Sequence, residues 1–264
     1  MQTIKVKEYI VDWLRSYALN AGVKGFVVGI SGGIDSAVTS SLCARTGLPV
    51  LCVEMPIHQS EDQVTRAVKH IHKLQEAYGN VSYSSVNLTG VFDNFITELP
   101  DAPDSEERQM SLVNTRARLR MTTLYYFAAL NKYLVAGTGN KVEDFGVGFY
   151  TKYGDGGVDL SPIADLVKTE VYALGKEMGV IEEIMQAPPT DGLWGDSRTD
   201  EDQIGASYPE LEWAMEQAGM GKNASDFEGR NREVFEIYLR YNRANKHKME
   251  PIPVCAIPKE LKRD

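Results

Sequence analysis

Cysteine, long apolar runs and basic charge are all scarce in this chain. The 264 residues include three cysteines, Cys43, Cys52 and Cys255, and no Cys-x-x-Cys pair. An odd number of scattered thiols argues against a disulfide framework or a zinc ribbon and is typical of a reducing compartment. No uninterrupted apolar stretch is long enough to span a bilayer, and the first residues carry charges where a signal peptide has an apolar core. We therefore expect a cytoplasmic protein.

Acidic residues outnumber basic ones. Lys and Arg total 28 against 37 Asp and Glu, a formal net charge of −9. This balance disfavours nucleic acids and anionic membranes as partners, so a phosphate-rich small ligand needs a local basic cluster. No repeat, linker or low-complexity tract divides the sequence. We expect residues 1–264 to form a single domain.

Apolar strand-like runs alternate with helix-like segments over the first half of the chain. The strand-like runs are residues 26–30, 48–55, 81–88 and 133–136, and the helix-like segments are 6–17, 34–46, 64–74 and 112–131. This order predicts an α/β fold, in which helices on both faces wind a parallel sheet and ligands bind at the carboxyl ends of its strands. The polar segment 98–107 is predicted to be a surface connection, and 187–209 a mobile lid.

The hexapeptide Ser31-Gly32-Gly33-Ile34-Asp35-Ser36 joins the first strand-like run to a helix. Two glycines let the backbone approach a ligand, and free N–H groups at a helix start attract an anion. The two serine hydroxyls are further donors, while Asp35 is a hard oxygen ligand for Mg²⁺. A plain glycine turn does not require these side chains. No Walker pattern is present, so a different phosphate-binding loop is predicted.

Two further motifs follow the last strand-like run. In Gly137-Thr138-Gly139-Asn140-Lys141-Val142-Glu143-Asp144, the valine at 142 and the late position argue against a dinucleotide fingerprint. Glu143 or Asp144 could complete a metal site with Asp35, although a solvated acidic pair is an equally good interpretation from the residues alone. Residues 148–159 interleave glycines with aromatics and lysines, which suits a planar charged ligand or, alternatively, packed hairpin turns.

The hexapeptide resembles the Ser-Gly-Gly-x-Asp-Ser loop of the N-type ATP pyrophosphatases, which cleave ATP between its α and β phosphates. Together with Gly-Thr-Gly-Asn-Lys-x-Glu at 137–143, Thr-Lys-Tyr-Gly-Asp-Gly-Gly at 151–157, the arginines of 114–120 and Lys246-His247-Lys248, it resembles the bacterial ammonia-dependent NAD synthetases. That resemblance spans nearly the whole chain. It implies a Rossmann-like, adenine nucleotide α-hydrolase-like fold. The implied reaction is ATP-dependent amidation of deamido-NAD by ammonia, through an adenylated carboxylate, giving NAD, AMP and pyrophosphate.

The resemblance also implies residue roles. Asp35 and Glu143 would hold Mg²⁺. ATP would be bound by Gly29, Ile30, Ser31, Gly32, Gly33, Ile34, Asp35, Ser36, Thr138, Lys168 and Thr190. Deamido-NAD would be bound by Arg118, Lys152, Asp159, His247 and Lys248. Asp35 and Lys168 would be catalytic, and Asp155 is our candidate for capturing and deprotonating ammonium.

The chain departs from the family pattern at two places. Ile34 stands where many relatives have Gln, and one extra residue separates Glu143 from Lys152. The second departure leaves the choice between Glu143 and Asp144 open.

His70 and His72, two apart on a helix, diverge too far to share a metal and are expected at the surface.

Two expectations concern assembly and nitrogen. Apolar residues lie around most of the circumference of segment 112–131, which together with the resemblance predicts a homodimer with deamido-NAD near Arg118 at the subunit boundary. The synthetase-like motifs occupy residues 29–248, which leaves no room for a glutaminase domain, so free ammonia is the expected nitrogen source. The rival interpretations are another adenylating enzyme, such as a tRNA thiolation enzyme, and a nucleotide sensor without chemistry.

Overall fold

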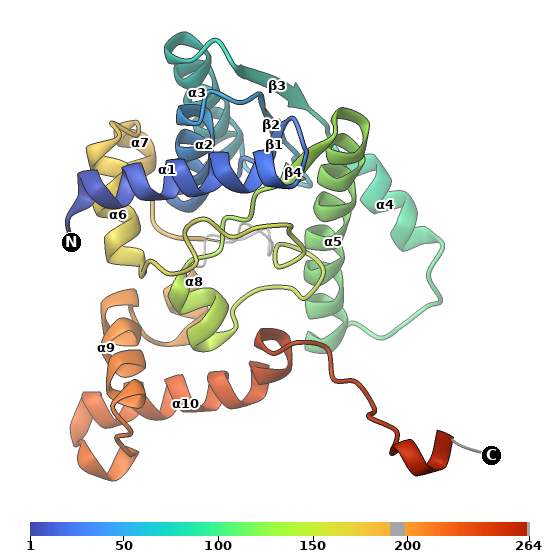
Figure 1. Cartoon of the computed structure of the whole chain (residues 1–264). Helices are drawn as coiled ribbons and strands as arrows, with labels where there is room; N and C mark the ends of the chain where they lie inside the picture. Colours follow the sequence, from blue (N-terminus) through green and yellow to red (C-terminus); the bar gives the residue numbers. More distant parts are fainter. Residues whose placement is uncertain (191–198, 263–264) are drawn as a thin grey trace.

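The computed structural model, which describes residues 1–190 and 199–262, contains a four-stranded parallel sheet, seen in the upper part of Figure 1. The strands are β1 (Gly25–Gly29), β2 (Val50–Glu54), β3 (Val81–Ser85) and β4 (Tyr133–Val135), in the order β3-β2-β1-β4. Every pairing is parallel. The predicted α/β class is confirmed, and all four carboxyl ends lie at one edge of the sheet.

Helices cover both faces of this sheet, because alternate side chains of each strand are buried on opposite sides. Phe26 and Val28 of β1 share one core cluster with α1 (Thr3–Asn20), α2 (Ile34–Arg45), α3 (Glu61–Ala77), α6 (Lys168–Glu177) and α7 (Glu182–Met185). Val27, between them, shares another cluster with α4 (Thr89–Thr97) and α5 (Glu106–Asn131). β1 is therefore buried on both faces, and the loop that follows it has a rigid base.

A third core cluster lies beyond the sheet. It is formed by the π-helix η1 (Val142–Val147), α8 (Asp200–Ile204), α9 (Tyr208–Gly219) and α10 (Gly229–Met249). The 3₁₀ turns are η2 (Ala224–Asp226) and η3 (Lys259–Lys262), and Figure 1 shows the C-terminal segment leading away from the body. None of the helices in the described parts of the chain is both long and apolar enough for a membrane span.

Two predicted connections are shorter in the structure. α5 begins at Glu106 rather than at 112, where the Ser105 hydroxyl accepts a hydrogen bond from the Arg108 N–H at 3.3 Å. The predicted surface connection is shortened accordingly. Of the predicted lid, residues 191–198 lie outside the described residues, and the remainder contains α8 and the start of α9.

The prediction of surface histidines was wrong for His70. Its side chain is buried in α3, and its Nε2 lies 3.0 Å from the hydroxyl of Ser40 on α2. The apolar face of α3 therefore includes this imidazole, which sequence periodicity treats as polar. His72 is exposed, as predicted.

Candidate active site

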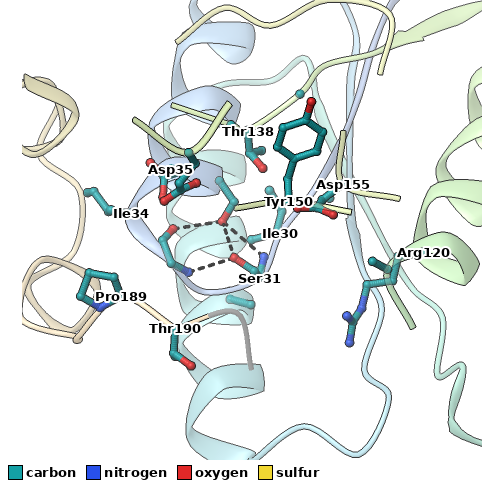
Figure 2. A pocket seen from close by; sticks show the side chains of 18 of the residues that line it. Ile30, Ser31, Ile34, Asp35, Arg120, Thr138, Tyr150, Asp155, Pro189 and Thr190 are labelled. Atoms are coloured by element: carbon teal, nitrogen blue, oxygen red, sulfur yellow. Dashed lines mark hydrogen bonds between the residues drawn. The ribbon is translucent and has the colours of Figure 1, made fainter. Parts of the chain in front are cut away.

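The loop between β1 and α2 has a fixed backbone shape. Gly32 has a φ of +83°, and a Cβ there would lie 2.6 Å from the carbonyl oxygen of Gln63 on α3, so only glycine fits. The hydroxyls of Ser31 and Ser36 lie 3.2 Å apart, and Ser36 also donates to the Gly33 carbonyl at 3.0 Å (Figure 2). In the structure these hydroxyls brace the loop, and both serines line the pocket, so their role as ligand donors stays a prediction. The first N–H groups of α2 have no partner within the helix and remain suited to an anion.

One pocket is lined by residues at the carboxyl ends of the strands, by this loop and by the segment after β4. Every predicted ATP-binding residue except Gly32 lines it. Thr138 and Thr190, far apart in sequence, lie on different sides of the loop in Figure 2. The fold thus brings together one candidate nucleotide pocket from segments across most of the chain.

Lys168 joins the two predicted metal carboxylates. It is the first residue of α6 and is buried, and its Nζ lies 2.6 Å from Asp35 Oδ2 and 3.0 Å from Glu143 Oε1. Burial acts to lower the pKa of Lys168, but the two carboxylates outweigh it and raise the pKa above its usual value. The ammonium therefore remains charged, and Lys168 is one of the residues that line the pocket.

Asn140, just before the π-helix η1, hydrogen-bonds to the same group of charged side chains. Its Nδ2 donates to Asp35 Oδ1 at 3.3 Å, and its Oδ1 accepts from the N–H groups of Val142 and Glu143, each at 3.2 Å. Asn140 thereby ties the start of η1 to the carboxylate of α2. This contact fixes Glu143 next to Asp35 despite the extra residue that follows it in the sequence.

Glu143 and Asp144 have different surroundings. Glu143 reaches the Lys168 ammonium, whereas the Asp144 carboxylate lies against Gly139, where a Cβ would overlap it. Burial, with the charge of Glu143 as the next cause, raises the pKa of Asp144 to about 8. Of the two, Glu143 is the one that contacts the same ammonium as Asp35, and its role as a metal ligand stays a prediction.

Asp155, the predicted ammonium-binding residue, also lines the pocket. Its Oδ1 accepts a hydrogen bond from the Thr151 N–H at 2.9 Å. Burial raises its pKa to about 6, although that hydrogen bond acts to lower it. In Figure 2 the side chain lies near Tyr150, across the loop from Thr190.

The predicted dinucleotide-binding residues surround the pocket without lining it, with one of them placed apart. Arg118 of α5 donates to the Lys152 carbonyl at 3.3 Å, and Lys152 Nζ donates to the His247 carbonyl at 2.8 Å. Lys248 Nζ donates to the carbonyl of Tyr150, a pocket residue, at 2.7 Å. The fold therefore gathers these four residues from α5, the 148–159 segment and α10.

Asp159 is the residue placed apart. Its Oδ1 accepts from the Tyr125 hydroxyl at 3.0 Å, and its Oδ2 accepts from the Val135 N–H at 2.8 Å. Both oxygens are thus engaged in holding β4 against α5. A ligand role for Asp159 stays a prediction that would require one of these bonds to be exchanged.

Sequence reasoning missed Tyr208 and Asp200. The Tyr208 hydroxyl donates to Glu143 Oε1 at 2.5 Å, and Asp200 Oδ2 lies 3.2 Å from the same hydroxyl. One signal was available, because Ser207-Tyr208-Pro209-Glu210 has the capping-box spacing with proline near the helix start. It would have located the start of α9 but not its approach to Glu143.

The pocket and the sheet define the class of protein: an α/β nucleotide-binding protein with its loop, carboxylates and lysine at the strand ends. Within that class, residues 6–252 match the NAD synthase family, and the chain belongs to this family. A relative from Carboxydothermus hydrogenoformans, named an NH(3)-dependent NAD(+) synthetase, is 36% identical over 247 residues, covering 91% of this chain and 93% of its own length.

Two solved structures are similar over nearly their whole length. The NMN synthetase from Francisella tularensis has a TM-score of 0.83 at 29% identity, covering 98% of this chain and 99% of its own. The NH3-dependent NAD synthetase from Campylobacter jejuni, solved with nitrate, has a TM-score of 0.77 at 26% identity, covering 97% and 100%. The expected adenine nucleotide α-hydrolase-like fold is thereby confirmed.

Proposed function

We propose that this chain is an ammonia-dependent NAD synthetase that converts deamido-NAD, ATP and ammonia into NAD, AMP and pyrophosphate. Membership of the NAD synthase family over residues 6–252 is the observation that carries the proposal. The pocket supports it, because the braced loop and the Lys168 ammonium can offset the charge of a nucleotide triphosphate.

Activation of the substrate carboxylate is the first chemical requirement. An oxide is an impossible leaving group for attack by ammonia, so AMP must replace it. The attacking carboxylate approaches an anionic α-phosphate, and Lys168 with the first N–H groups of α2 would offset that repulsion. The same groups would stabilise the charge that develops as pyrophosphate leaves. ATP would lie along Gly29–Ser36, with Thr138 and Thr190 on other sides of the pocket.

Asp35 and Glu143 are the residues that would hold Mg²⁺. They fit this ion, because two hard carboxylates converge on one ammonium position and Mg²⁺ commonly takes one or two carboxylates plus substrate phosphates. Mg²⁺ bound there would neutralise phosphate charge. Among the described residues no group of three or more candidate metal ligands occurs.

Ammonia delivery is the second chemical requirement. Ammonium predominates at neutral pH, so a carboxylate near the acyl carbon would capture the cation and accept its proton. Asp155 suits this role, since its buried carboxyl lines the pocket and its raised pKa makes it a stronger base than an exposed aspartate. Arg118, Lys152, His247 and Lys248 would bind the dinucleotide at the edge of the pocket.

A second candidate substrate is nicotinic acid mononucleotide, favoured by the likeness to the Francisella tularensis NMN synthetase. The reactive carboxylate is the same, and only the AMP half is missing. Purified protein with ATP, Mg²⁺ and ammonium should amidate deamido-NAD at a kcat/KM at least ~10-fold above that for the mononucleotide. The opposite preference would make the chain an NMN synthetase.

Ammonia is the proposed nitrogen source. With glutamine freed of ammonia in place of ammonium, almost no NAD should form.

Assembly and location complete the proposal. We infer that residues 1–264 act as one unit and that two copies form a homodimer through α4 and α5, where Val91, Phe95, Tyr126 and Leu130 are exposed. Exposed apolar side chains gathered on neighbouring helices are typical of an interface. The free thiols of all three cysteines support a reducing cytoplasm as the site of the reaction.

A further inference from the structure

Tyr208 connects the helical core to the lysine and carboxylates of the pocket. Its side chain is buried at the first residue of α9, 65 positions after Glu143 in the sequence. The hydroxyl donates to Glu143 Oε1, the same oxygen that the Lys168 ammonium contacts.

The ring of Tyr208 contacts the cluster as well. Lys168 Nζ lies 4.5 Å from the ring centroid, within the range of a cation–π interaction. One side chain therefore contacts Lys168 through its face and Glu143 through its hydroxyl. Lys168 is surrounded by Asp35, Glu143 and this ring, and all three contacts limit where its ammonium can lie.

The backbone of Tyr208 is held by α8. Its N–H donates to Glu201 Oε1 at 2.8 Å, and Asp200 Oδ2 lies 3.2 Å from its hydroxyl as an alternative acceptor. The Asp200 N–H in turn donates to the Pro189 carbonyl at 3.0 Å, next to Thr190 in the pocket. Tyr208 thus contacts α8 and the carboxylate cluster directly, and it is linked to the pocket segment through Asp200.

We propose that Tyr208 is a positioning residue for the amidation reaction: its hydroxyl fixes the Glu143 carboxylate, and through it the Lys168 ammonium, in the place required for pyrophosphate departure. The proposal rests on the proposed function, since it assigns Lys168 the phosphate-facing role. Tyr208 does not line the pocket, so it acts through Glu143 rather than on substrate.

Electrostatics explains why one hydroxyl matters here. Glu143 Oε1 divides its lone pairs between the phenol proton and the ammonium. Without the hydroxyl, the carboxylate is free to turn about its side-chain torsions and pairs more strongly with Lys168, which holds the ammonium away from a phosphate. Displacement of a catalytic group by about 1 Å can cost ~100-fold in rate. Loss of one supporting hydrogen bond is expected to cost less, roughly 10-fold.

The test is Tyr208→Phe, which retains the ring and its contact with Lys168. The matched control is Tyr241→Phe, because Tyr241 belongs to the same helical core and its hydroxyl donates to the Gln203 carbonyl at 3.1 Å. We expect kcat to fall ~10-fold in Tyr208→Phe. The KM for ATP and the KM for deamido-NAD should stay within ~2-fold of wild type, and the melting temperature should be unchanged. Tyr241→Phe should keep the wild-type kcat.

A double-mutant cycle separates positioning from a structural effect. If Tyr208 acts through Glu143, Tyr208→Phe should change kcat by less than ~2-fold when Glu143→Gln is already present. An equal fall in both backgrounds, a fall matched by Tyr241→Phe, or a wild-type rate for Tyr208→Phe would each overturn the proposal. Absence of NAD synthesis by the wild-type protein would instead contradict the proposed function.

Discussion

Lys168 is the residue on which the chemistry of the pocket depends most. Its ammonium is the cation that approaches both Asp35 and Glu143, and burial removes water that would otherwise screen these charges. A lysine at the first residue of a helix does not suit the helix dipole. Its position is therefore better explained by a ligand that carries phosphate charge than by the stability of α6.

Removal of either member of the Lys168–Asp35 pair should reduce turnover sharply. We predict that Lys168→Ala and Asp35→Asn each lower kcat at least ~100-fold, because both act on charge that develops during pyrophosphate departure. Circular dichroism should show an unchanged fold. The control Lys69→Ala removes an ion pair with Glu183 that is about half exposed, and it should leave kcat within ~2-fold. A near-normal rate in either active-site variant would remove that residue from the mechanism.

His70 should make the folded protein sensitive to acid. Burial is the main cause that lowers its pKa to about 4, from 6.5 for an ordinary histidine. Between these values the unfolded chain binds a proton that the folded protein does not, so stability falls as the pH falls from 6.5 towards 4. This imidazole should cost about 2 kcal/mol of unfolding free energy at pH 5 relative to pH 7.5.

Urea denaturation of wild type and His70→Gln at pH 5 and pH 7.5 measures the contribution of His70 to the pH dependence of the unfolding free energy. Between pH 7.5 and pH 5, wild type should lose about 2 kcal/mol more unfolding free energy than His70→Gln loses. Comparison with the variant cancels the contributions of other titrating groups. A difference that does not change with pH would show that His70 is charged in the folded protein.

At the scale of elements, the β1–α2 loop has the strictest backbone requirement. Gly32→Ala places a Cβ against the Gln63 carbonyl at a positive φ, so we predict loss of measurable ATP binding and a clear loss of stability. Gly47→Ala, at the other end of α2, has a φ of +75° and open space around it. It should cost about 1 kcal/mol and leave ATP binding intact. Isothermal titration with ATP distinguishes the two outcomes, and wild-type affinity in Gly32→Ala would contradict this account of the loop.

The elements that could be predicted are those whose apolar pattern is repeated locally. β1 and α2 follow from Phe26 to Ile30 and the glycine loop, and α3 follows from the apolar spacing of segment 64–74. The helices after 142 were not predicted, and η1 is a π-helix, a form that the 3.6-residue apolar period does not indicate. Tyr208 could not be assigned to the site, because its contact with Glu143 exists only after two core clusters have packed together.

At the scale of the whole molecule, the dimer is the property most open to direct test. Tyr126 and Leu130 on α5 expose 63% and 65% of their surface, and Leu130→Glu should place a charge in the proposed interface. We predict that this variant sediments as a monomer and is less active than wild type at a concentration where wild type is dimeric. Leu19→Glu, with 60% exposure on α1, is the control and should remain dimeric. A fully active wild-type monomer would contradict the assembly.

Transfer of oxygen from substrate to AMP tests the central claim most directly. Deamido-NAD labelled with heavy oxygen in its nicotinate carboxylate should pass one labelled atom to AMP for each NAD formed, because the carboxylate attacks the α-phosphorus of ATP. Mass spectrometry of the products measures this. The account predicts labelled AMP with unlabelled pyrophosphate. Label in inorganic phosphate, formation of ADP, or AMP without label would show that the carboxylate is not adenylated.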